Sequence, residues 1–331
     1  MTGAPDGLST TRGQLGRLLH VGRIVLLLVV IVAAGLALRR HWGEVTETVA
    51  SLSWRTWLPS MMFVPIAIGC STMSWQAFVD ELGEPIGAAR GAQIFLVGQL
   101  GKYVPGSVWA YVLQLELGRR AGLARARIFA ATVFSIAVAV VAALISGSMA
   151  IPAIVRTDEA LSALTWLYLL LPVGVVCLHP RILSWAARQG FRILRRPAPA
   201  HPIRKRAVAR SLGWALAAYG CFGVHLWLLT REVAVPTFEN LGLTVGTMAL
   251  AMISGLFFFL LPSGAGVREA VIVAALAPWV GIGRAVGYAA VSRVMLTVGD
   301  LLMAGGAALL AVFENRRHGR IPPDPGLVEI S

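Results

Sequence analysis

The sequence is poor in charged residues, and acidic residues are the scarcer of the two signs. Charged residues make up 14% of the chain, with 16 Asp and Glu against 29 Lys and Arg, whereas about a quarter of residues are charged in soluble domains. Hydrophobic residues reach 57%, and the mean hydropathy is +0.73. This balance excludes a water-soluble globular protein and predicts an all-α integral membrane protein.

The sequence also lacks the residue patterns of common catalytic and cofactor sites. The six histidines show neither HExxH nor any other paired spacing, and the three cysteines are too scattered for a CxxC metal site. The glycine-rich segment at 264–266 lacks the rest of a nucleotide-binding loop. In the predicted outside loop after the first apolar run, Glu44 and Glu47 are the only acidic residues and no aspartate occurs, which argues against a polyprenyl-dependent glycosyltransferase. We therefore expect no enzyme activity, no metal and no cofactor.

The net charge of +13 lies in short gaps between apolar runs. The positive-inside rule and anionic lipid account for such gaps, so we expect no nucleic-acid partner. The segment 181–210 holds nine basic and no acidic residues. We predict that it is a cytoplasmic loop that contacts anionic lipid, and that an N-terminal tail at 1–20 and a C-terminal tail at 314–331 are cytoplasmic as well. The predicted location is the cell (plasma) membrane.

Apolar runs recur along the whole chain. Most of them approach the ~20 residues that an α-helix needs to cross ~30 Å of hydrocarbon. They predict a single polytopic membrane domain over 1–331, with about six to eight transmembrane helices. The runs are Ile24 to Leu38, Trp57 to Val79, Ile128 to Val155, Leu161 to Leu178, Ser211 to Thr230, Leu241 to Leu261 and Val294 to Phe313.

One further apolar stretch, Ala92 to Leu117, has basic flanks on both sides that we predict to be cytoplasmic. Pro105 and Gly106 lie in its middle, where an uninterrupted helix is disfavoured. These features predict a re-entrant hairpin that enters and leaves on one side of the membrane. The alternative is a peripheral amphipathic helix followed by a loop.

A second interruption follows Leu241 to Leu261, where the sequence Pro262-Ser-Gly-Ala-Gly266 precedes another apolar stretch that ends at Val280. We predict a second broken hairpin, entered from the opposite side, so that the two halves form an inverted repeat. Interrupted segments at matching positions in two halves indicate the binding site of a transporter. The alternative is two complete spans.

Charged residues inside hydrocarbon are costly, so those that occur there are candidates for function. Arg268 and Glu269 follow the second interruption at a predicted helix start, where free N–H groups attract anions. Arg293 and Asp300 are two helical turns apart and share one face, and Lys102 lies beside the first interruption. We predict that these residues bind a lipid phosphate. The alternative is that Arg268/Glu269 and Arg293/Asp300 only neutralise each other.

Two motifs carry a resemblance to a known family. They are Gly98-Gln-Leu-Gly-Lys-Tyr-Val-Pro-Gly106, before a cluster of arginines, and Leu261-Pro-Ser-Gly-Ala-Gly-Val-Arg-Glu269, with Arg293 downstream. The chain resembles the family of the lysylphosphatidylglycerol synthase transmembrane region, or flippase-like domain, from about residue 20 to residue 313. The residues that match its motifs are Lys102, Pro105, Gly106, Pro262, Gly264, Gly266, Arg268, Glu269 and Arg293.

The resemblance implies translocation of aminoacylated phospholipid between leaflets, while a separate cytosolic domain makes that lipid. The chain has no polar stretch long enough for such a domain, so we do not expect it to be the transferase. We expect a flippase-like protein that binds and translocates a phosphate-bearing lipid, either an aminoacylated phospholipid or a polyprenyl-phosphate-linked intermediate. The alternative is a non-transporting membrane partner of an envelope biosynthesis enzyme, such as a glycosyltransferase.

Overall fold

The computed structural model describes residue 39 and residues 42–104, 108–150, 169–193, 202–233, 237–257 and 262–317. Within these ranges every regular element is a helix, which confirms the predicted all-α fold. The helices in chain order are α2 (Trp42–Ser51), α3 (Trp54–Glu81), α4 (Ala88–Ala92), η1 (Gln93–Val97), η2 (Leu100–Tyr103), α5 (Val108–Arg120), α6 (Arg125–Gly147), α8 (Leu170–Cys177), α9 (Pro180–Ile193), α10 (Lys205–Thr230), α11 (Phe238–Phe257), η4 (Pro262–Gly264), α12 (Val267–Val280) and α13 (Ile282–Arg317).

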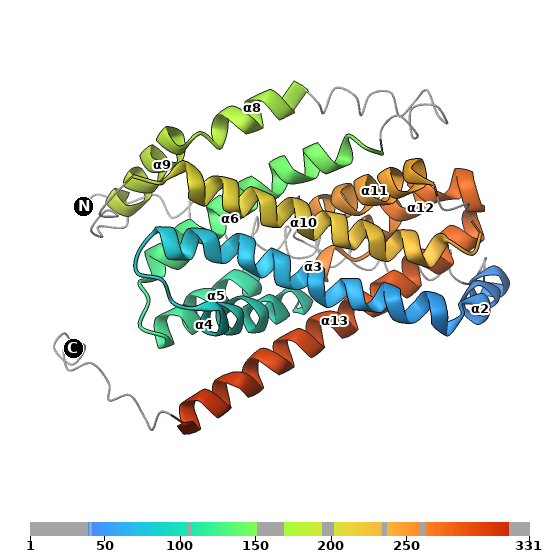
Figure 1. The fold of residues 1–331 in the computed structure, drawn as a ribbon, viewed down its shortest axis with the longest axis horizontal. Coiled ribbons are helices and arrows are strands. Elements are labelled where there is room, and N and C mark those ends of the chain that lie inside the picture. Colours follow the sequence, from blue (N-terminus) through green and yellow to red (C-terminus); the bar gives the residue numbers. More distant parts are fainter. Residues whose placement is uncertain are drawn as a thin grey trace, which may run out of the picture.

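Four of the described helices, α3, α6, α10 and α13, are long and apolar enough to cross a membrane. They form the body of the bundle in Figure 1, and they establish a multi-pass membrane protein. The predicted span at 24–38 lies outside the described residues, as does the first part of the one at 161–178, up to residue 168. The total of six to eight spans therefore stays a prediction.

Helices α3 and α10 run antiparallel and pack against each other along most of their length. At one end, Arg204 Nη2 lies 3.0 Å from Glu81 Oε2, joining the start of α10 to the end of α3. At the other end, Arg231 donates to the carbonyl oxygen of Arg55 at 3.2 Å. Each of these helices precedes a broken hairpin, so their opposite directions agree with an inverted repeat.

The first hairpin lies between α3 and α6. Its arms, α4 with η1 and η2 on one side and α5 on the other, pack so closely that a Cβ on Gly101 would stand 2.6 Å from the backbone nitrogen of Ala110. Arg127 at the start of α6 donates to the carbonyl oxygen of Val79 near the end of α3, at 2.7 Å. The chain thus enters and leaves at one end of the bundle. Because η1 also packs on α13, the segment is a re-entrant hairpin rather than a peripheral helix and loop.

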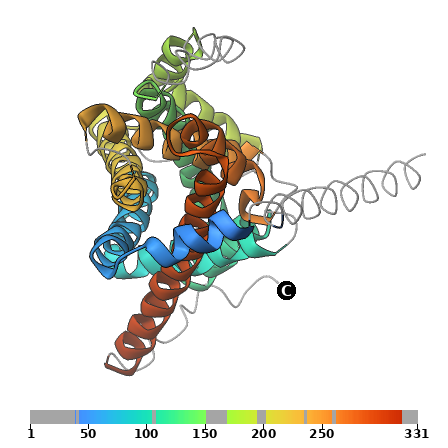
Figure 2. The ribbon, with the colours of Figure 1, turned by 90° about the vertical axis from the view of Figure 1, so that its right-hand side faces the viewer.

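The second hairpin consists of α11, η4 and α12, and it enters from the opposite end. Figure 1 shows α11 and α12 in the half of the bundle nearer α2, and α4 and α5 in the other half. At the end where α12 leads into α13, a Cβ on Gly287 would stand 2.9 Å from Cβ of Thr48 in α2. Figure 2 shows α2 lying across this end of the bundle. Two re-entrant hairpins of opposite direction therefore meet inside the bundle.

The segment predicted as a basic loop at 181–210 is largely helical, which corrects that prediction. It contains α9 and the start of α10. α9 is amphipathic, because it buries Leu183 and Phe191 in the core while Arg181 and Arg188 are exposed. The amphipathic spacing of these residues supplies the apolar face that a solvated loop would lack.

Three predicted helix boundaries are also wrong. α10 begins at Lys205 rather than Ser211, and α13 begins at Ile282 rather than Val294. α13 also continues to Arg317, so the predicted tail at 314–331 starts as helix. Long basic side chains can continue a helix past its apolar run because their stems pack along apolar surface while their charges reach water.

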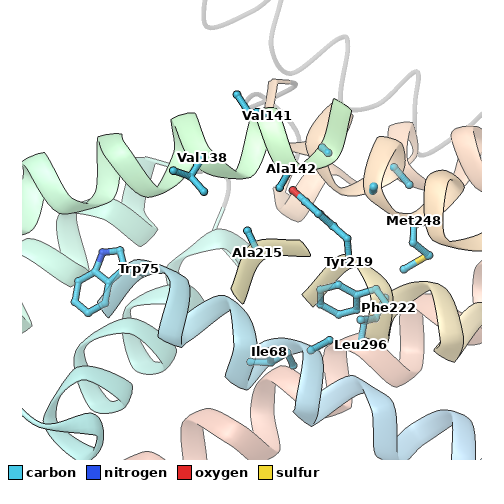
Figure 3. Close-up of a cluster of buried hydrophobic side chains, with 14 of the residues drawn as sticks. Ile68, Trp75, Val138, Val141, Ala142, Ala215, Tyr219, Phe222, Met248 and Leu296 are labelled. Atoms are coloured by element: carbon cyan, nitrogen blue, oxygen red, sulfur yellow. The ribbon is translucent and has the colours of Figure 1, made fainter. Parts of the chain in front are cut away.

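A contiguous apolar core joins the first hairpin to the long helices. The ring of Trp75 on α3 lies 5.4 Å from that of Phe95 on η1, and the ring of Phe78 lies 5.6 Å from that of Phe134 on α6. Figure 3 shows the Tyr219 hydroxyl of α10 directed towards α6, where it donates to Ala139 O at 3.1 Å. This packing fixes the hairpin within the bundle.

Candidate functional site

The tip of the first hairpin contacts the middle of α13 through a polar cluster. Lys102 Nζ on η2 lies 2.6 Å from Asp300 Oδ2. The hydroxyl of Tyr103 donates to the same oxygen at 2.6 Å. The side chains of Lys102 and Asp300 are only 24% and 13% exposed, so this ion pair is largely removed from solvent. It joins residues about 200 positions apart in the sequence, as the separation of 197 between Tyr103 and Asp300 shows.

The tip of the second hairpin is tied to α13 at Arg293, about two helical turns before Asp300. Arg293 Nη1 donates to the carbonyl oxygen of Ser263 at 3.2 Å and to Glu269 Oε1 at 3.1 Å. The other oxygen of Glu269 accepts from the N–H of Gly266 at 2.6 Å, which satisfies a free donor at the start of α12. Arg293 therefore fixes both sides of the turn that precedes α12.

The backbone of this second turn explains its glycines. Ser263, Gly264 and Gly266 have φ of 53°, 65° and 86°, all in the left-handed region that favours glycine. A Cβ on Gly264 would also stand 2.5 Å from Cα of Gly255 in α11. The sequence Pro-Ser-Gly-Ala-Gly thus serves both to reverse the chain and to let the two arms approach closely.

Arg268 is a buried cation for which the described residues supply few partners. It is 8% exposed, and its Nε and Nη2 atoms have no hydrogen-bond partner among the described residues. Arg293, Glu269, Asp300, Tyr103 and His225 are ionisable groups near enough to interact with its charge. A buried charge without matched partners is costly, so its retention indicates a use.

The charges of this cluster do not balance. Three cations, Lys102, Arg268 and Arg293, face two carboxylates, Glu269 and Asp300. Arg268 is also the second residue of the 14-residue helix α12, whose N-terminal end adds positive potential. The cluster therefore has the net positive charge and the unpartnered donors that a monoanion requires.

The observed ion pairs differ from those expected from sequence proximity. Arg293 pairs with Glu269 rather than with Asp300, and Asp300 pairs with Lys102 from the other hairpin. The Glu269 carboxylate is engaged by Arg293 and by the N–H of Gly266, so it offsets the charge of Arg268 from nearby without a hydrogen bond to its Nε or Nη2.

A buried histidine links three long helices beside the cluster. Nδ1 of His225 on α10 lies 2.8 Å from Ser60 Oγ on α3, and its Nε2 lies 3.0 Å from Ser292 Oγ on α13. His225 is fully buried and near enough to Arg268 for their charges to interact. Its two nitrogens are satisfied by these hydroxyls, as expected for a packed residue in a span rather than a metal ligand.

A cavity of about 270 Å³ lies beside the Lys102–Asp300 pair, and both residues line it. Its wall is formed by η1, η2, α3, α5, α6, α10, α11 and α13, so both hairpins and the four long helices contribute to it. The π-helical turn η1 places Phe95 and Leu96 in this wall, and such turns are frequent at functional sites. Lys102 and Asp300 are the charged members of the wall among the described residues.

The structure brings together most of the residues predicted for the site. Lys102, Arg268, Glu269, Arg293 and Asp300 form the charged cluster. Gly264 and Gly266 form the turn beside it, and Pro262 begins η4 in the same turn. Pro105 and Gly106 lie outside the described residues.

Sequence reasoning missed three contributors to the site. Tyr103 was adjacent to Lys102 and could have been included on that ground. Nothing in the sequence pointed to the carbonyl oxygen of Ser263 or to Gln114 of the cavity wall, because their roles depend on contacts between distant segments. No group of His, Cys, Asp and Glu that could hold a metal ion occurs in the described part of the chain.

Comparison with known protein families gives a match that covers most of the chain. The model of the family described as Lysylphosphatidylglycerol synthase TM region matches residues 21–304. This range contains both hairpins and the whole charged cluster. A search of curated proteins finds no match for the sequence.

Proposed function

The chain belongs to the lysylphosphatidylglycerol synthase TM region family, and from this premise we propose that it binds a phosphate-bearing lipid and moves it between leaflets. Membership of the family relates the chain to lipid handling in a membrane. The proposal adds the translocation step and the site at which it occurs. In this proposal the chain makes and breaks no covalent bond.

One observation carries the proposal, namely that Nε and Nη2 of the buried Arg268 have no hydrogen-bond partner among the described residues. It is buried where the two hairpins meet, beside an ion pair that faces a cavity. A lipid phosphodiester carries one negative charge, which would neutralise the excess charge of the cluster. Guanidinium groups bind phosphate oxygens through two parallel N–H donors, and Arg268 offers Nε and Nη2 for this purpose.

Translocation is supported by the arrangement of the hairpins. They enter the bundle from opposite ends and meet at Lys102, Asp300 and Arg268. A phosphate that enters the cavity meets Lys102 first, and it can replace Asp300 as the partner of that lysine. Arg268 then offers the next cation. Broken segments of opposite orientation around one central site are the arrangement that alternating access uses in transporters.

The test is lipid movement in liposomes, measured as protection of fluorescent phosphatidylglycerol or fluorescent polyprenyl phosphate from an impermeant quencher. Arg268→Ala should abolish protein-dependent movement, because a charge-assisted hydrogen bond to phosphate contributes about 1.5 to 3 kcal/mol. Arg268→Lys should restore it only in part, since an ammonium group lacks the planar fork.

Arg284→Ala is the matched control, because Arg284 is an exposed arginine at the start of α13. It should leave movement unchanged. Full recovery of movement in the Arg268→Ala/Glu269→Gln double variant would contradict phosphate binding and leave Arg268 as a charge-balancing residue. Arg268-dependent lipid binding without any movement would instead favour the non-transporting partner of an envelope enzyme.

We also propose that the end of the bundle that holds Arg204 and Arg127 faces the cytoplasm of the plasma membrane, because basic residues gather there. In a background without native cysteines, Arg188→Cys on α9 and Phe238→Cys on α11 mark opposite ends, and both residues are exposed. An impermeant thiol reagent added to intact cells should label Phe238→Cys alone. Labelling of Arg188→Cys alone would invert the orientation.

The exposed face of α9 supports contact with anionic lipid at the same end. Arg181, Trp185, Arg188 and Arg192 recur at helical spacing and are all exposed, while Leu183 is buried in the bundle. A tryptophan among arginines suits the headgroup region, where the indole ring lies at the interface and the guanidinium groups reach lipid phosphates. We propose this stripe as the surface that holds the cytoplasmic leaflet against the protein.

A further inference from the structure

We propose that the cavity beside Lys102 binds an uncharged, hydroxyl-rich headgroup, such as a sugar or another polyol, attached to the lipid phosphate. The inference rests on the proposed function, because it takes the phosphate to lie at Lys102 and Arg268. It adds which chemical class of lipid the site accepts.

The wall of the cavity has the composition of a site for hydroxyl groups. Uncharged polar side chains enter it from α3, α5, α6 and the chain around η2, and they stand among aromatic rings. The polar members are Ser71, Ser74, Gln99, Gln114, Thr132 and Ser135, and the aromatic members include Trp75, Phe95, Tyr111 and Tyr219. Ser71, Ser74 and Ser135 each donate to a backbone carbonyl oxygen of the protein, and their oxygens can still accept from the hydroxyl groups of a ligand, while ring C–H faces pack on the aromatics.

Gln114 on α5 provides the strongest single indication. Its side chain is 1% exposed, it lines the cavity, and its Nε2 has no hydrogen-bond partner among the described residues. Trp75 Nε1 donates to Thr132 Oγ1 at 3.0 Å, and Thr132 donates in turn to Gln114 Oε1 at 3.3 Å. This chain fixes the amide so that its oxygen is occupied and its N–H donors remain available. A buried donor without a partner is costly unless a ligand satisfies it.

The charges of the cavity argue against a cationic aminoacyl headgroup. Asp300 is the only carboxylate in the wall among the described residues. Lys102 and the hydroxyl of Tyr103 both lie 2.6 Å from it. When a phosphate takes Lys102, the freed carboxylate keeps Tyr103 and remains near Arg268. Among the described residues the wall offers a lysyl ammonium no carboxylate other than Asp300, which Tyr103 already engages, whereas an uncharged polyol needs no carboxylate.

The geometry of the first hairpin places Lys102, which would hold the phosphate, and Gln114, which would bind hydroxyl groups, at a spacing that suits one headgroup. Gly98 lies against Gln114, since a Cβ on Gly98 would stand 3.2 Å from Cα of Gln114. Lys102 lies four residues beyond Gly98, which is one turn or about 6 Å along a helical arm. One sugar ring or glycerol unit attached to the phosphate can span this separation.

Binding of defined lipids to the protein in nanodiscs tests the inference. The probes are polyprenyl phosphate, the same lipid carrying one hexose, lysyl-phosphatidylglycerol and phosphatidylglycerol. We expect the hexose conjugate to bind at least about tenfold more tightly than bare polyprenyl phosphate, which corresponds to one or two satisfied hydrogen bonds. Phosphatidylglycerol should bind more tightly than its lysyl form.

Two variants separate the headgroup site from other effects. Gln114→Met keeps the size of the side chain, and it should remove the preference for the hexose while bare polyprenyl phosphate binds as before. Gln76→Met is the matched control, because Gln76 is also buried but is absent from the cavity wall. It should leave the preference unchanged.

The outcomes distinguish this inference from the proposed function. Equal binding of the two polyprenyl lipids in the native protein, or tighter binding of lysyl-phosphatidylglycerol, overturns the headgroup site and leaves the phosphate site intact. Binding of bare polyprenyl phosphate that Arg268→Ala does not weaken overturns the proposed function itself. Glucose 1-phosphate, which has no tail, should bind far more weakly. Equal binding of that soluble compound would show that the ligand is not a lipid.

Discussion

The two hairpins use the same sequence devices, yet they hold their cations in opposite states. In the first hairpin, Lys102 is paired with Asp300 and faces the cavity. In the second, Arg268 is buried with two nitrogens that lack partners among the described residues, while the neighbouring Arg293 is occupied by Glu269. The first cation can exchange its partner for a ligand that arrives from the cavity, and the second has donors that are already available.

This difference indicates a division of labour between the hairpins. A paired cation contributes to the stability of the bundle as well as to binding, because its loss leaves a carboxylate without a partner. An unpartnered buried cation contributes no such stability and is retained only if a ligand uses it. Among the described residues of the two hairpins, the left-handed turn is found in the second, while Pro105 and Gly106 of the first lie outside the described part of the chain.

The backbone difference gives the largest expected effect on stability. Gly264→Ala should destabilise the protein by about 3 kcal/mol, since it combines a left-handed conformation, costing about 1 to 2 kcal/mol, with overpacking against Gly255. Gly101→Ala meets only the overpacking against Ala110 and should cost about 1 to 2 kcal/mol. Thermal melting in detergent checks both values.

The control for the glycine comparison is Gly69→Ala in α3. A Cβ at Gly69 would meet no atom within 4 Å, and alanine is favoured over glycine in a helix. This variant should melt at or above the temperature of the native protein. If Gly264→Ala melted no lower than Gly101→Ala, the second turn would not depend on its left-handed backbone.

The next largest expected effect is the difference in stability between variants of Arg293 and Arg268. Arg293→Met should lower stability by about 2 kcal/mol, less than the roughly 3 to 5 kcal/mol of a fully buried pair, because the Arg293 and Glu269 side chains are 23% and 24% exposed. Arg268→Met should leave stability unchanged or raise it, since Nε and Nη2 lose no hydrogen bond. Chemical denaturation of both variants measures the difference. Equal losses would show that Arg268 has a structural role like that of Arg293.

The smallest expected effect concerns the hydroxyl of Tyr103. Tyr103→Phe removes its hydrogen bond to Asp300 and leaves the ion pair with Lys102 in place, so the cost should be about 1 kcal/mol. The same change should tighten the hold of Asp300 on Lys102 and thereby slow lipid movement. If Tyr103→Phe lost as much stability as Arg293→Met, the first hairpin would depend on its polar contacts as strongly as the second hairpin does.

Several features of the site were predictable from the sequence because their causes are local. Proline and glycine in the middle of an apolar stretch interrupt a helix whatever surrounds it, so both hairpins were located before the structure was known. Charged residues within apolar runs are equally visible, which identified Lys102, Arg268 and Asp300 as candidates.

Charge counting could not decide whether the second stretch was a hairpin or two spans, because both end on the same side. The structure decides this through the position of the turn, because Arg293 in the interior of α13 donates to the carbonyl oxygen of Ser263 and η4 also contacts η2 of the first hairpin. The structure also revealed helix α9 within the predicted basic loop. The many arginines of this segment drew attention away from the helical spacing of its buried apolar residues, such as Leu183 and Phe191.

The sequence by itself determined that this protein is a helical membrane protein with two interrupted segments and a small set of intramembrane charges. The tertiary structure alone decided which charges pair, since Lys102 meets Asp300 and Arg293 meets Glu269 only through the packing of both hairpins on α13. It also decided that Gln114 lines a cavity. Hydropathy and helix breaking act within a few residues, whereas ion pairs and cavity walls join side chains that only the folded bundle brings together.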